Sequence, residues 1–214
     1  MIASGSLKVI LITTFLFLLL IVLNYFFPSI ILKILTIGFG IIFLFNFYFF
    51  RDPDRDIPQG DNLILSPAYG TVIQICEVDE PYYFKKKVRR ISIFLSVFNV
   101  HVNRVPISGK VDFYKYIKGK FLVAFADKAS ESNEQTVIGI QNSKGKVLFK
   151  QIAGIIARRI ICNITNEDSV VAGERFGLIH YGSRADIFIP DNVEIKVKLN
   201  DKVLGGESVI GEFK

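Results

Sequence analysis

A glycine and a serine stand next to each other at positions 182 and 183, inside the apolar stretch LIHYGSRADIFIP. Glycine within a strand most often marks a bulge or a close approach of the backbone. A Gly-Ser bond also permits a reaction, because the serine hydroxyl can attack the preceding carbonyl and turn the amide into an ester. Elimination then breaks the chain, and the remaining dehydroalanine hydrolyses to an N-terminal pyruvoyl group. Gly182 suits this chemistry since it has no Cβ to hinder a strained backbone, and Ser183 would need a base nearby.

The two histidines of the chain are the candidate bases. His101 lies in SVFNVHVNRVPISG, where an extended backbone would place it on one face with Asn99 and Asn103. A single histidine in a strand is more often structural than catalytic. His180 is the weaker candidate because it does not alternate in phase with Ser183. No P-loop, Gly-x-Ser-x-Gly, HExxH or paired-carboxylate motif is present, so the known serine hydrolases are poor matches.

The composition narrows the class of protein. The chain has 214 residues, 50% of them apolar, with a mean hydropathy of +0.40 and a net charge of +6. The first fifty residues hold Lys8, Lys33 and no acidic side chain, which leaves a net charge of +4 on the remainder. This mild excess suits work beside an anionic lipid surface and argues against nucleic acid as a partner. The basic run KKKVRR at 85–90 could contact phosphate head groups or form a solvated hairpin rim.

Cys76 and Cys162 lie far apart, each in an apolar run, without a CxxC pair or a histidine-rich tract. We therefore expect no metal site and predict two reduced core residues. Unpaired cysteines of this kind favour a cytoplasmic compartment.

Two apolar runs fill the N-terminal fifty residues. Residues 9–32 carry no charge and exceed the roughly 20 residues that a helix needs to cross a bilayer. Pro28 and Ser29 break this run, and the second run, 34–50, ends in the aromatic sequence FNFYFF, which is typical of a membrane interface. We predict that residues 1–50 form a membrane-associating helical hairpin that spans the bilayer or dips into it.

Two alternatives to this hairpin are weaker. A cleavable signal peptide would be shorter and would have small residues where NYFFPS stands, and a buried soluble hairpin would not need so many consecutive Leu, Ile and Phe residues. Basic residues flank both ends of the predicted hairpin, Lys8 before it and Arg51 and Arg55 after it. Their positions favour an orientation in which both ends of the hairpin, and the domain that follows, lie on the cytoplasmic face of the cell membrane. Lys33 in the turn argues against a full crossing.

Residues 51–214 follow a different pattern. After the linker RDPDRDIPQGDN, short β-branched or aromatic runs alternate with Gly and Pro. The run 136–154 is predicted to be a hairpin with residues 143–145 at its tip, whereas residues 153–161 could form a short helix or a strand. No βαβ alternation appears, so we predict a mainly β domain, a compact antiparallel sandwich or barrel.

The chain resembles the short, bacterial and archaeal-type branch of the phosphatidylserine decarboxylase family in seven ordered stretches, from Phe49 nearly to the C-terminus: FFRDPDR, SPAYG, FLSVFNVHVNRVPISGKV, DKASESNEQ, QIAGIIARRI, GERFGLIHYGSRADIFIP and GGESVIG. The resemblance implies a β-rich fold like the barrel-sandwich hybrids, preceded by a membrane-associating helical segment. It also implies self-cleavage at Gly182-Ser183, giving a heterodimer of a β chain, residues 1–182, and an α chain, residues 183–214.

The implied cofactor is the pyruvoyl group made from Ser183, with neither a metal nor pyridoxal phosphate. The resemblance implies that its ketone forms a Schiff base with phosphatidylserine in an anionic membrane. Loss of carbon dioxide then yields phosphatidylethanolamine. His101 matches the family's catalytic histidine, and its ordinary pKa near 6.5 suits a general acid or base near neutral pH. Asn103 and Arg104 beside it are expected to help bind substrate.

Two positions qualify the resemblance. Arg104 stands where longer family members have a second histidine, as is usual in the short branch. Tyr69 stands in SPAYG, where the family typically has SPADG and the aspartate orients the histidine for self-cleavage. A phenol with a pKa of about 10 is not a carboxylate at neutral pH, although it can form a hydrogen bond to a histidine and so assist maturation.

Two other functions stay open at this point. Tyr69 favours a non-cleaving relative that binds anionic phospholipid without turnover. A membrane-tethered carrier domain would need an exposed, modifiable lysine at a hairpin tip, and Lys144 is a weak candidate for it.

Overall fold

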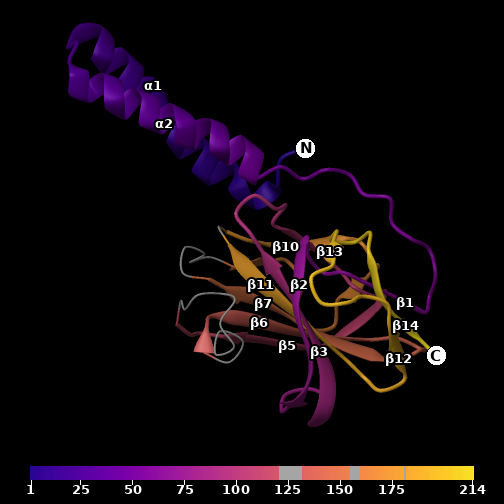
Figure 1. Cartoon of the computed structure of the whole chain (residues 1–214). Helices are drawn as coiled ribbons and strands as arrows, with labels where there is room; N and C mark the ends of the chain where they lie inside the picture. Colours follow the sequence, from indigo (N-terminus) through magenta and orange to yellow (C-terminus); the bar gives the residue numbers. More distant parts are fainter. Residues whose placement is uncertain (121–131, 155–159, 181) are drawn as a thin grey trace. The chain divides into compact units, whose positions relative to one another are not determined.

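The computed structural model describes residues 1–120, 132–154, 160–180 and 182–214. The chain forms two compact units, Met1–Pro53 and Asp54–Lys214 (Figure 1). The sequence analysis placed the division between residues 50 and 51.

The first unit is built from two apolar helices. A short 3-10 turn, η1 (Ser4–Ser6), leads into α1 (Leu7–Phe26), and α2 (Ile30–Phe49) runs back along it (Figure 1). Pro28 lies between the helices, where it disfavours helical backbone at the preceding residue. Ser29 Oγ then accepts a hydrogen bond from Leu32 N–H at 3.2 Å and caps the N-terminus of α2.

Polar side chains join α1 and α2 at two levels. Asn24 Nδ2 donates to Thr36 Oγ1 near the turn, and Asn46 Nδ2 donates to Thr13 Oγ1 near the open end, both at 3.3 Å. Most of the large apolar side chains on both helices are exposed. Both helices are long and apolar enough to cross a membrane by length and composition. The helical hairpin is thus confirmed as a structural element, and its insertion stays a prediction.

The second unit is mainly β, and its strands pair antiparallel. The strands are β1 (Leu63–Leu65), β2 (Gly70–Glu80), β3 (Lys86–Leu95), β4 (Val102–Arg104), β5 (Gly109–Ile117), β6 (Gln135–Gln141), β7 (Lys146–Ala153), β8 (Ile160–Cys162), β9 (Ser169–Val170), β10 (Arg175–Ile179), β11 (Ser183–Ile189), β12 (Val193–Ile195), β13 (Lys202–Val203) and β14 (Val209–Phe213). The largest sheet has the order β13-β2-β3-β11-β7-β6-β5-β9, and two three-stranded sheets have the orders β1-β14-β12 and β4-β10-β8. The predicted antiparallel β domain is confirmed.

Strand β11 lies in the middle of the largest sheet, between β3 and β7, and all seven of its residues are buried. Because side chains alternate along a strand, Ala185, Ile187 and Ile189 face the main apolar core. Arg184 and Asp186 face the opposite side of the sheet. The side of β11 opposite the core thus begins with the charged pair Arg184 and Asp186 and continues with the apolar Phe188, and both faces of the strand are covered.

Two local predictions can be compared with the structure. The hairpin is confirmed, with β6 and β7 joined through a tip at 142–145, where Asn142 N–H donates to Gly145 O at 2.9 Å. Of the segment 153–161, residues 155–159 lie outside the described residues, while Ile160 begins β8. The stretch before β4 differs from an extended strand, since Ser96 and Asn99 form a turn there.

Candidate active site

The predicted scissile bond lies where the chain enters β11. Gly182 has a φ of +73°, a left-handed conformation that strains residues with a Cβ. A Cβ built on Gly182 would meet only ordinary contacts, the nearest being Val97 Cγ1 at 3.6 Å. Glycine is therefore required here by the backbone conformation and not by lack of space.

Ser183 is the first residue of β11 and is fully buried between Leu95 of β3 and Ala153 of β7. Its Oγ has no hydrogen-bond partner among the described residues. A buried polar atom without a partner is uncommon, because it has lost its hydration without compensation. This hydroxyl is therefore not used in a structural hydrogen bond, which suits a nucleophile.

His101 precedes β4, and its side chain is fully buried. Its Nδ1 lies 2.9 Å from the carbonyl oxygen of Asn99, which only accepts hydrogen bonds, so Nδ1 carries the proton. Nε2 is then the basic nitrogen, and it accepts the Gly182 N–H at 3.2 Å. The structure thus brings the histidine and the Gly182-Ser183 bond together from segments about eighty residues apart in the sequence.

The neighbours of His101 differ from the expectation of a shared strand face. Asn99 belongs to the turn, where its Oδ1 accepts from Ser96 N–H at 2.8 Å, and it contacts His101 through its backbone carbonyl. His180, the weaker candidate, is buried just after β10.

Asn103 and Arg104 are buried in β4, and their hydrogen bonds hold the strand in place. Asn103 Nδ2 donates to Pro67 O at 3.4 Å, and its Oδ1 accepts from Gln151 Nε2 at 2.9 Å. The Arg104 backbone N–H donates to the same Pro67 carbonyl at 3.0 Å, and its Nη1 donates to Gly173 O at 2.9 Å. The SPAYG segment is thereby tied to the strand that follows the histidine. A role of these two residues in substrate binding stays a prediction.

Tyr69, at the end of SPAYG, lies next to a pair of charged residues. Its ring lies 5.7 Å from the Arg55 guanidinium, and Arg55 Nη1 donates to Glu207 Oε2 at 3.2 Å. Within the part of the chain that the structure describes, the Tyr69 hydroxyl makes no hydrogen bond, so it does not orient His101. Assistance in maturation by Tyr69 stays a prediction.

The segment GGES, residues 205–208, packs against the SPAYG segment and Arg104. Gly206 has a φ of +76°, and a Cβ there would come within 2.4 Å of Arg104 Cδ. Gly206 N–H also donates to Ser66 O at 2.8 Å. A Cβ on Gly205 would lie 3.1 Å from the carbonyl carbon of Ala68. Both glycines therefore allow a close approach that joins three motifs distant in the sequence.

The two cysteines are free, as predicted. Both are half-buried, whereas the prediction placed them in the core. Cys162 packs against the main core cluster. Burial raises the pKa of its thiol to about 11, and the negative charge of Asp168 adds to the shift. The thiol is therefore protonated and unreactive near neutral pH.

Sequence reasoning missed several residues that shape this region. Gln151 joins Asn103 to Thr136, whose Oγ1 donates to Gln151 Oε1 at 2.7 Å. Arg55 and Glu207 form their ion pair across 152 residues. A polar residue inside the apolar run of β7 could have identified Gln151 from the sequence. No feature of the sequence indicates that Arg55 pairs with Glu207.

Together these residues can support one reaction. Ser183 supplies an uncommitted hydroxyl, Gly182 supplies an unhindered carbonyl in a left-handed backbone, and His101 supplies a basic nitrogen one residue away. This arrangement suits attack of the serine on the preceding carbonyl.

Comparison with known proteins gives consistent matches. The family model described as phosphatidylserine decarboxylase matches residues 42–211. A phosphatidylserine decarboxylase proenzyme of Cytophaga hutchinsonii is 48% identical over 205 residues, covering 94% of this chain and 93% of the relative. The protein of the same name from Chlorobium chlorochromatii is 45% identical over 214 residues and covers 100% of both chains. That from the Wolbachia of Brugia malayi is 50% identical over 185 residues, 82% of this chain and 80% of the relative.

Proposed function

Because the chain belongs to the phosphatidylserine decarboxylase family, we propose that it is a phosphatidylserine decarboxylase, made as a proenzyme that cleaves itself between Gly182 and Ser183. The observation that carries this proposal is the buried Ser183 hydroxyl without a partner, next to a left-handed Gly182 whose N–H contacts His101. The relatives' name, proenzyme, supports a processing step.

Self-cleavage begins with attack of Ser183 Oγ on the Gly182 carbonyl carbon, while His101 Nε2 takes the hydroxyl proton. The C–N bond breaks, and the amine of residue 183 leaves as the acyl group moves to oxygen. Loss of the α-proton of residue 183 then expels the Gly182 carboxylate and leaves dehydroalanine. Water replaces the amine of that residue, ammonia leaves, and the α chain begins with a pyruvoyl group.

The pyruvoyl group supplies a ketone that condenses with the substrate amine and accepts the electron pair released with carbon dioxide. The buried position of Ser183 fits this use because it excludes water from the reacting atoms. His101 then protonates the α-carbon that has lost its carboxylate, giving phosphatidylethanolamine. No metal is needed for either task.

The cleaved protein is proposed to stay together as a heterodimer of its β and α chains. Residues 183–189 form β11, which is hydrogen-bonded to β3 on one side and β7 on the other. Both neighbours belong to the β chain, so cleavage leaves the new chain end held in the centre of the sheet.

The substrate requires a membrane, and the N-terminal hairpin supplies an attachment to it. We propose that α1 and α2 insert in the cell membrane and that the second unit works on its cytoplasmic face, at phosphatidylserine in an anionic bilayer. The two long apolar helices and the excess of basic residues in the second unit support this location.

Mass spectrometry of the purified, aged chain tests the proposal. Wild-type protein should give two fragments, the smaller of which reacts with sodium borohydride or hydroxylamine at its N-terminal ketone. Ser183→Ala should give a single chain near 24.2 kDa with no decarboxylase activity. A wild-type chain that stays intact, with an ordinary serine at 183, would contradict self-cleavage.

A second candidate is a non-cleaving phospholipid-binding relative, favoured by one observation. Tyr69 replaces the family's carboxylate, and its hydroxyl makes no hydrogen bond among the described residues. Removal of an orienting carboxylate in a hydrolytic triad slows that chemistry about 10⁴-fold without abolishing it. Since each protein molecule cleaves once, we expect slow maturation, and Tyr69→Asp should accelerate it. An intact chain for both wild type and Tyr69→Asp would favour the lipid binder.

A further inference from the structure

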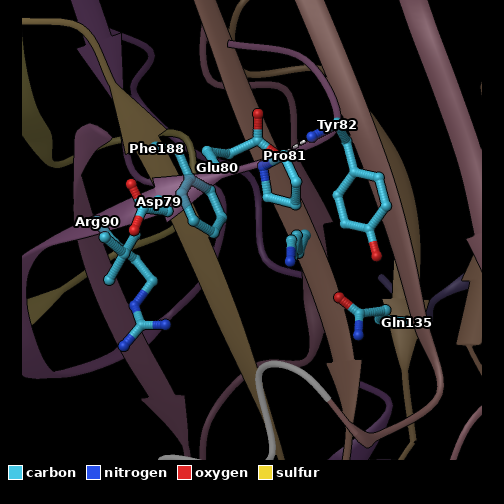
Figure 2. A pocket seen from close by; sticks show the side chains of 9 residues that line it. Asp79, Glu80, Pro81, Tyr82, Arg90, Gln135 and Phe188 are labelled. Atoms are coloured by element: carbon cyan, nitrogen blue, oxygen red, sulfur yellow. Dashed lines mark hydrogen bonds between the residues drawn. The ribbon is translucent and has the colours of Figure 1, made fainter. Parts of the chain in front are cut away.

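A cavity of about 410 Å³ opens on the face of the largest sheet that carries Phe188 (Figure 2). Its lining residues are Val78, Asp79, Glu80, Pro81, Tyr82, Arg90, Gln135, Lys150 and Phe188. Phe188 is five residues along β11 from Ser183, which corresponds to roughly 17 Å of strand. Gln135, at the other end of the cavity, is in register with Ile152 of β7 and Arg184 of β11, but the cavity opens on the side of the sheet to which Arg184 and Phe188 point, opposite the side of Ser183. The proposed decarboxylation makes no use of it.

Two buried cations lie at the base of this cavity. Lys150 is 7% exposed and Arg90 is 8% exposed, although both line an opening to solvent. Lys150 Nζ lies 5.1 Å from the centre of the Phe188 ring and 5.5 Å from that of Tyr82. Arg90 Nη2 donates to Gln74 Oε1 at 2.7 Å. These contacts fix both head groups in position, so an incoming anion would meet an ordered pair of cations.

Gln135 provides a second, independent indication of a ligand. Its side chain is 1% exposed, and its Oε1 has no hydrogen-bond partner among the described residues. Its Nε2 donates to Asn133 O at 3.2 Å, which fixes the amide orientation, because a flipped amide would oppose two oxygens. Figure 2 shows the Gln135 amide and the Tyr82 hydroxyl facing the same space. An orphaned buried acceptor beside two cations calls for a ligand that also donates a hydrogen bond.

The acidic residues of the lining do not cancel this preference. Glu80 is directed into the turn that follows β2, where its carboxylate accepts from the backbone N–H groups of Tyr82, Tyr83 and Phe84 at 2.7–2.9 Å. Asp79 is exposed at the rim. A third acid, the fully buried Asp186, lies 4.0 Å from Arg90 Nε and is shared with Arg184, whose Nε donates to it at 2.6 Å. One carboxylate thus faces two guanidinium groups, and together with Lys150 the base of the cavity keeps an excess of positive charge.

We propose that this cavity binds a small phosphate-bearing molecule that also carries a hydrogen-bond donor, either a P–OH or an ammonium group. The phosphate oxygens contact Lys150 and Arg90, and the donor hydrogen-bonds to Gln135 Oε1. A volume of about 410 Å³ accommodates a phosphate together with a short polar chain. Free hydrogen phosphate and the head group of an aminophospholipid share this chemistry.

The donor requirement makes a sharp prediction. Hydrogen phosphate carries a proton near neutral pH, whereas sulfate has the same shape and no donor. Calorimetric titration of the full chain in detergent should show saturable binding of phosphate, about tenfold or more tighter than that of sulfate, because sulfate would leave Gln135 Oε1 facing an oxygen. Equal affinities, or no saturable binding of phosphate, would overturn the proposal.

Two variants and their matched controls assign the binding to this cavity. Lys150→Met should weaken phosphate binding by about tenfold or more, while Lys146→Met, on the same strand but outside the lining, should not. Gln135→Met should abolish the preference for phosphate over sulfate, while Gln141→Met, exposed on the same strand, should preserve it. Should Lys150→Met fail to fold, as judged by its melting temperature, Gln135→Met alone still decides.

Two further titrations distinguish the sources of the ligand. Tighter binding of glycerophosphoethanolamine than of inorganic phosphate would assign the cavity to a lipid head group, and the reverse order would assign it to a free phosphate. Because the proposal does not depend on self-cleavage, Ser183→Ala should bind these probes like the wild type. Loss of binding in Ser183→Ala would instead place the ligand at the reaction centre and overturn a separate site.

Discussion

At the scale of single residues, Gly182 connects conformation to chemistry. Its φ of +73° belongs to a region where a Cβ costs roughly 1–2 kcal/mol, yet the space around it would admit a methyl group. Because the backbone conformation and not the space disfavours a side chain at 182, the preference of the replacing residue for left-handed backbone should decide how well the site forms. Asparagine tolerates left-handed backbone better than alanine does.

We therefore expect Gly182→Ala to slow self-cleavage more than Gly182→Asn, although asparagine is the larger residue. Both variants should fold, because the nearest contact of the new Cβ is an ordinary 3.6 Å. The measurement is the fraction of cleaved chain against time on a denaturing gel. If the larger side chain is the more damaging one, steric exclusion and not φ would explain the glycine.

The proposed function gives His101 one task before cleavage and another after it, and an experiment can separate the two. For His101→Ala, we expect decarboxylation by the cleaved fraction to fall about 10²–10⁴-fold, the usual contribution of a general acid or base. Vesicle binding should stay near the wild-type value, since it depends on the apolar helices. The assay is carbon dioxide release per mole of pyruvoyl-bearing chain. Turnover like that of the wild type in this fraction would remove His101 from the mechanism.

The thiol of Cys162 should report its burial through its pH dependence. Its pKa is raised to about 11 by burial, so the reactive thiolate is scarce at pH 8–9 and grows only as the pH approaches 11. Iodoacetamide should thus modify Cys162 slowly in the folded protein at pH 8.5 and rapidly once the chain is denatured. Peptide mapping after timed alkylation measures this. Equal rates in the two states would show an accessible, ordinary thiol.

At the scale of elements, β11 would have to hold the chain end that the proposed cleavage creates. Arg184 follows directly after Ser183 and is fully buried. Its Nε donates to Asp186 Oδ1 at 2.6 Å, and its Nη2 donates to Ser92 Oγ at 2.7 Å. A strand terminus normally frays, whereas this side chain fastens the first residues of β11 to β3. Arg184 is thus a positioning residue for the reacting end of the α chain.

We expect Arg184→Met to lower the free energy of unfolding by about 3–5 kcal/mol, because it removes the 2.6 Å bond from Arg184 to the buried Asp186 carboxylate and leaves the longer 4.0 Å contact with Arg90. The double variant Arg184→Met/Asp186→Leu should recover part of that loss, since the two directly bonded charges are removed together while Arg90 loses its 4.0 Å contact with Asp186. Chemical denaturation of the uncleaved Ser183→Ala protein measures the effect without fragment dissociation. As a control, Lys86→Met breaks the exposed Lys86–Asp191 pair and should cost no more than about 1 kcal/mol. Equal losses for the two single variants would contradict a clamp at Arg184.

The sequence predicted those features that depend on residues close together in the chain and missed those that depend on distant partners. Alternation and turn residues are local, so the hairpin of β6 and β7 and the antiparallel class were predictable. The pairing of Gln151 with Asn103 spans 48 residues, and that of Arg55 with Glu207 spans 152, and no local pattern records such partners. The turn at Ser96 was missed for the opposite reason, because an Asn side chain captured a backbone N–H that a strand would have paired.

At the scale of the whole molecule, the proposed function assigns membrane attachment to the first unit and the reaction to the second. The first unit exposes apolar side chains along both helices, and the second unit carries the buried site and the basic surface residues. The residues that follow the helices are fastened to the second unit. Asp54 pairs with Arg175 and Arg55 with Glu207, each at 3.2 Å. A chain beginning at Arg51 keeps these pairs, so it removes the helices without removing the contacts of the linker.

We expect this shortened chain to fold and to leave the membrane fraction, whereas the full chain should require detergent for extraction. Leu18→Arg, which places a charge midway along α1, should weaken retention, because a charge at the centre of a membrane helix costs about 2.5–3.5 kcal/mol. Val171→Arg is the matched control, since it adds the same charge at an exposed apolar residue of the second unit and should not affect retention. The measurement is the partition between pellet and supernatant after carbonate washing. Full-length protein recovered from the supernatant without detergent would show that the apolar helices serve another purpose.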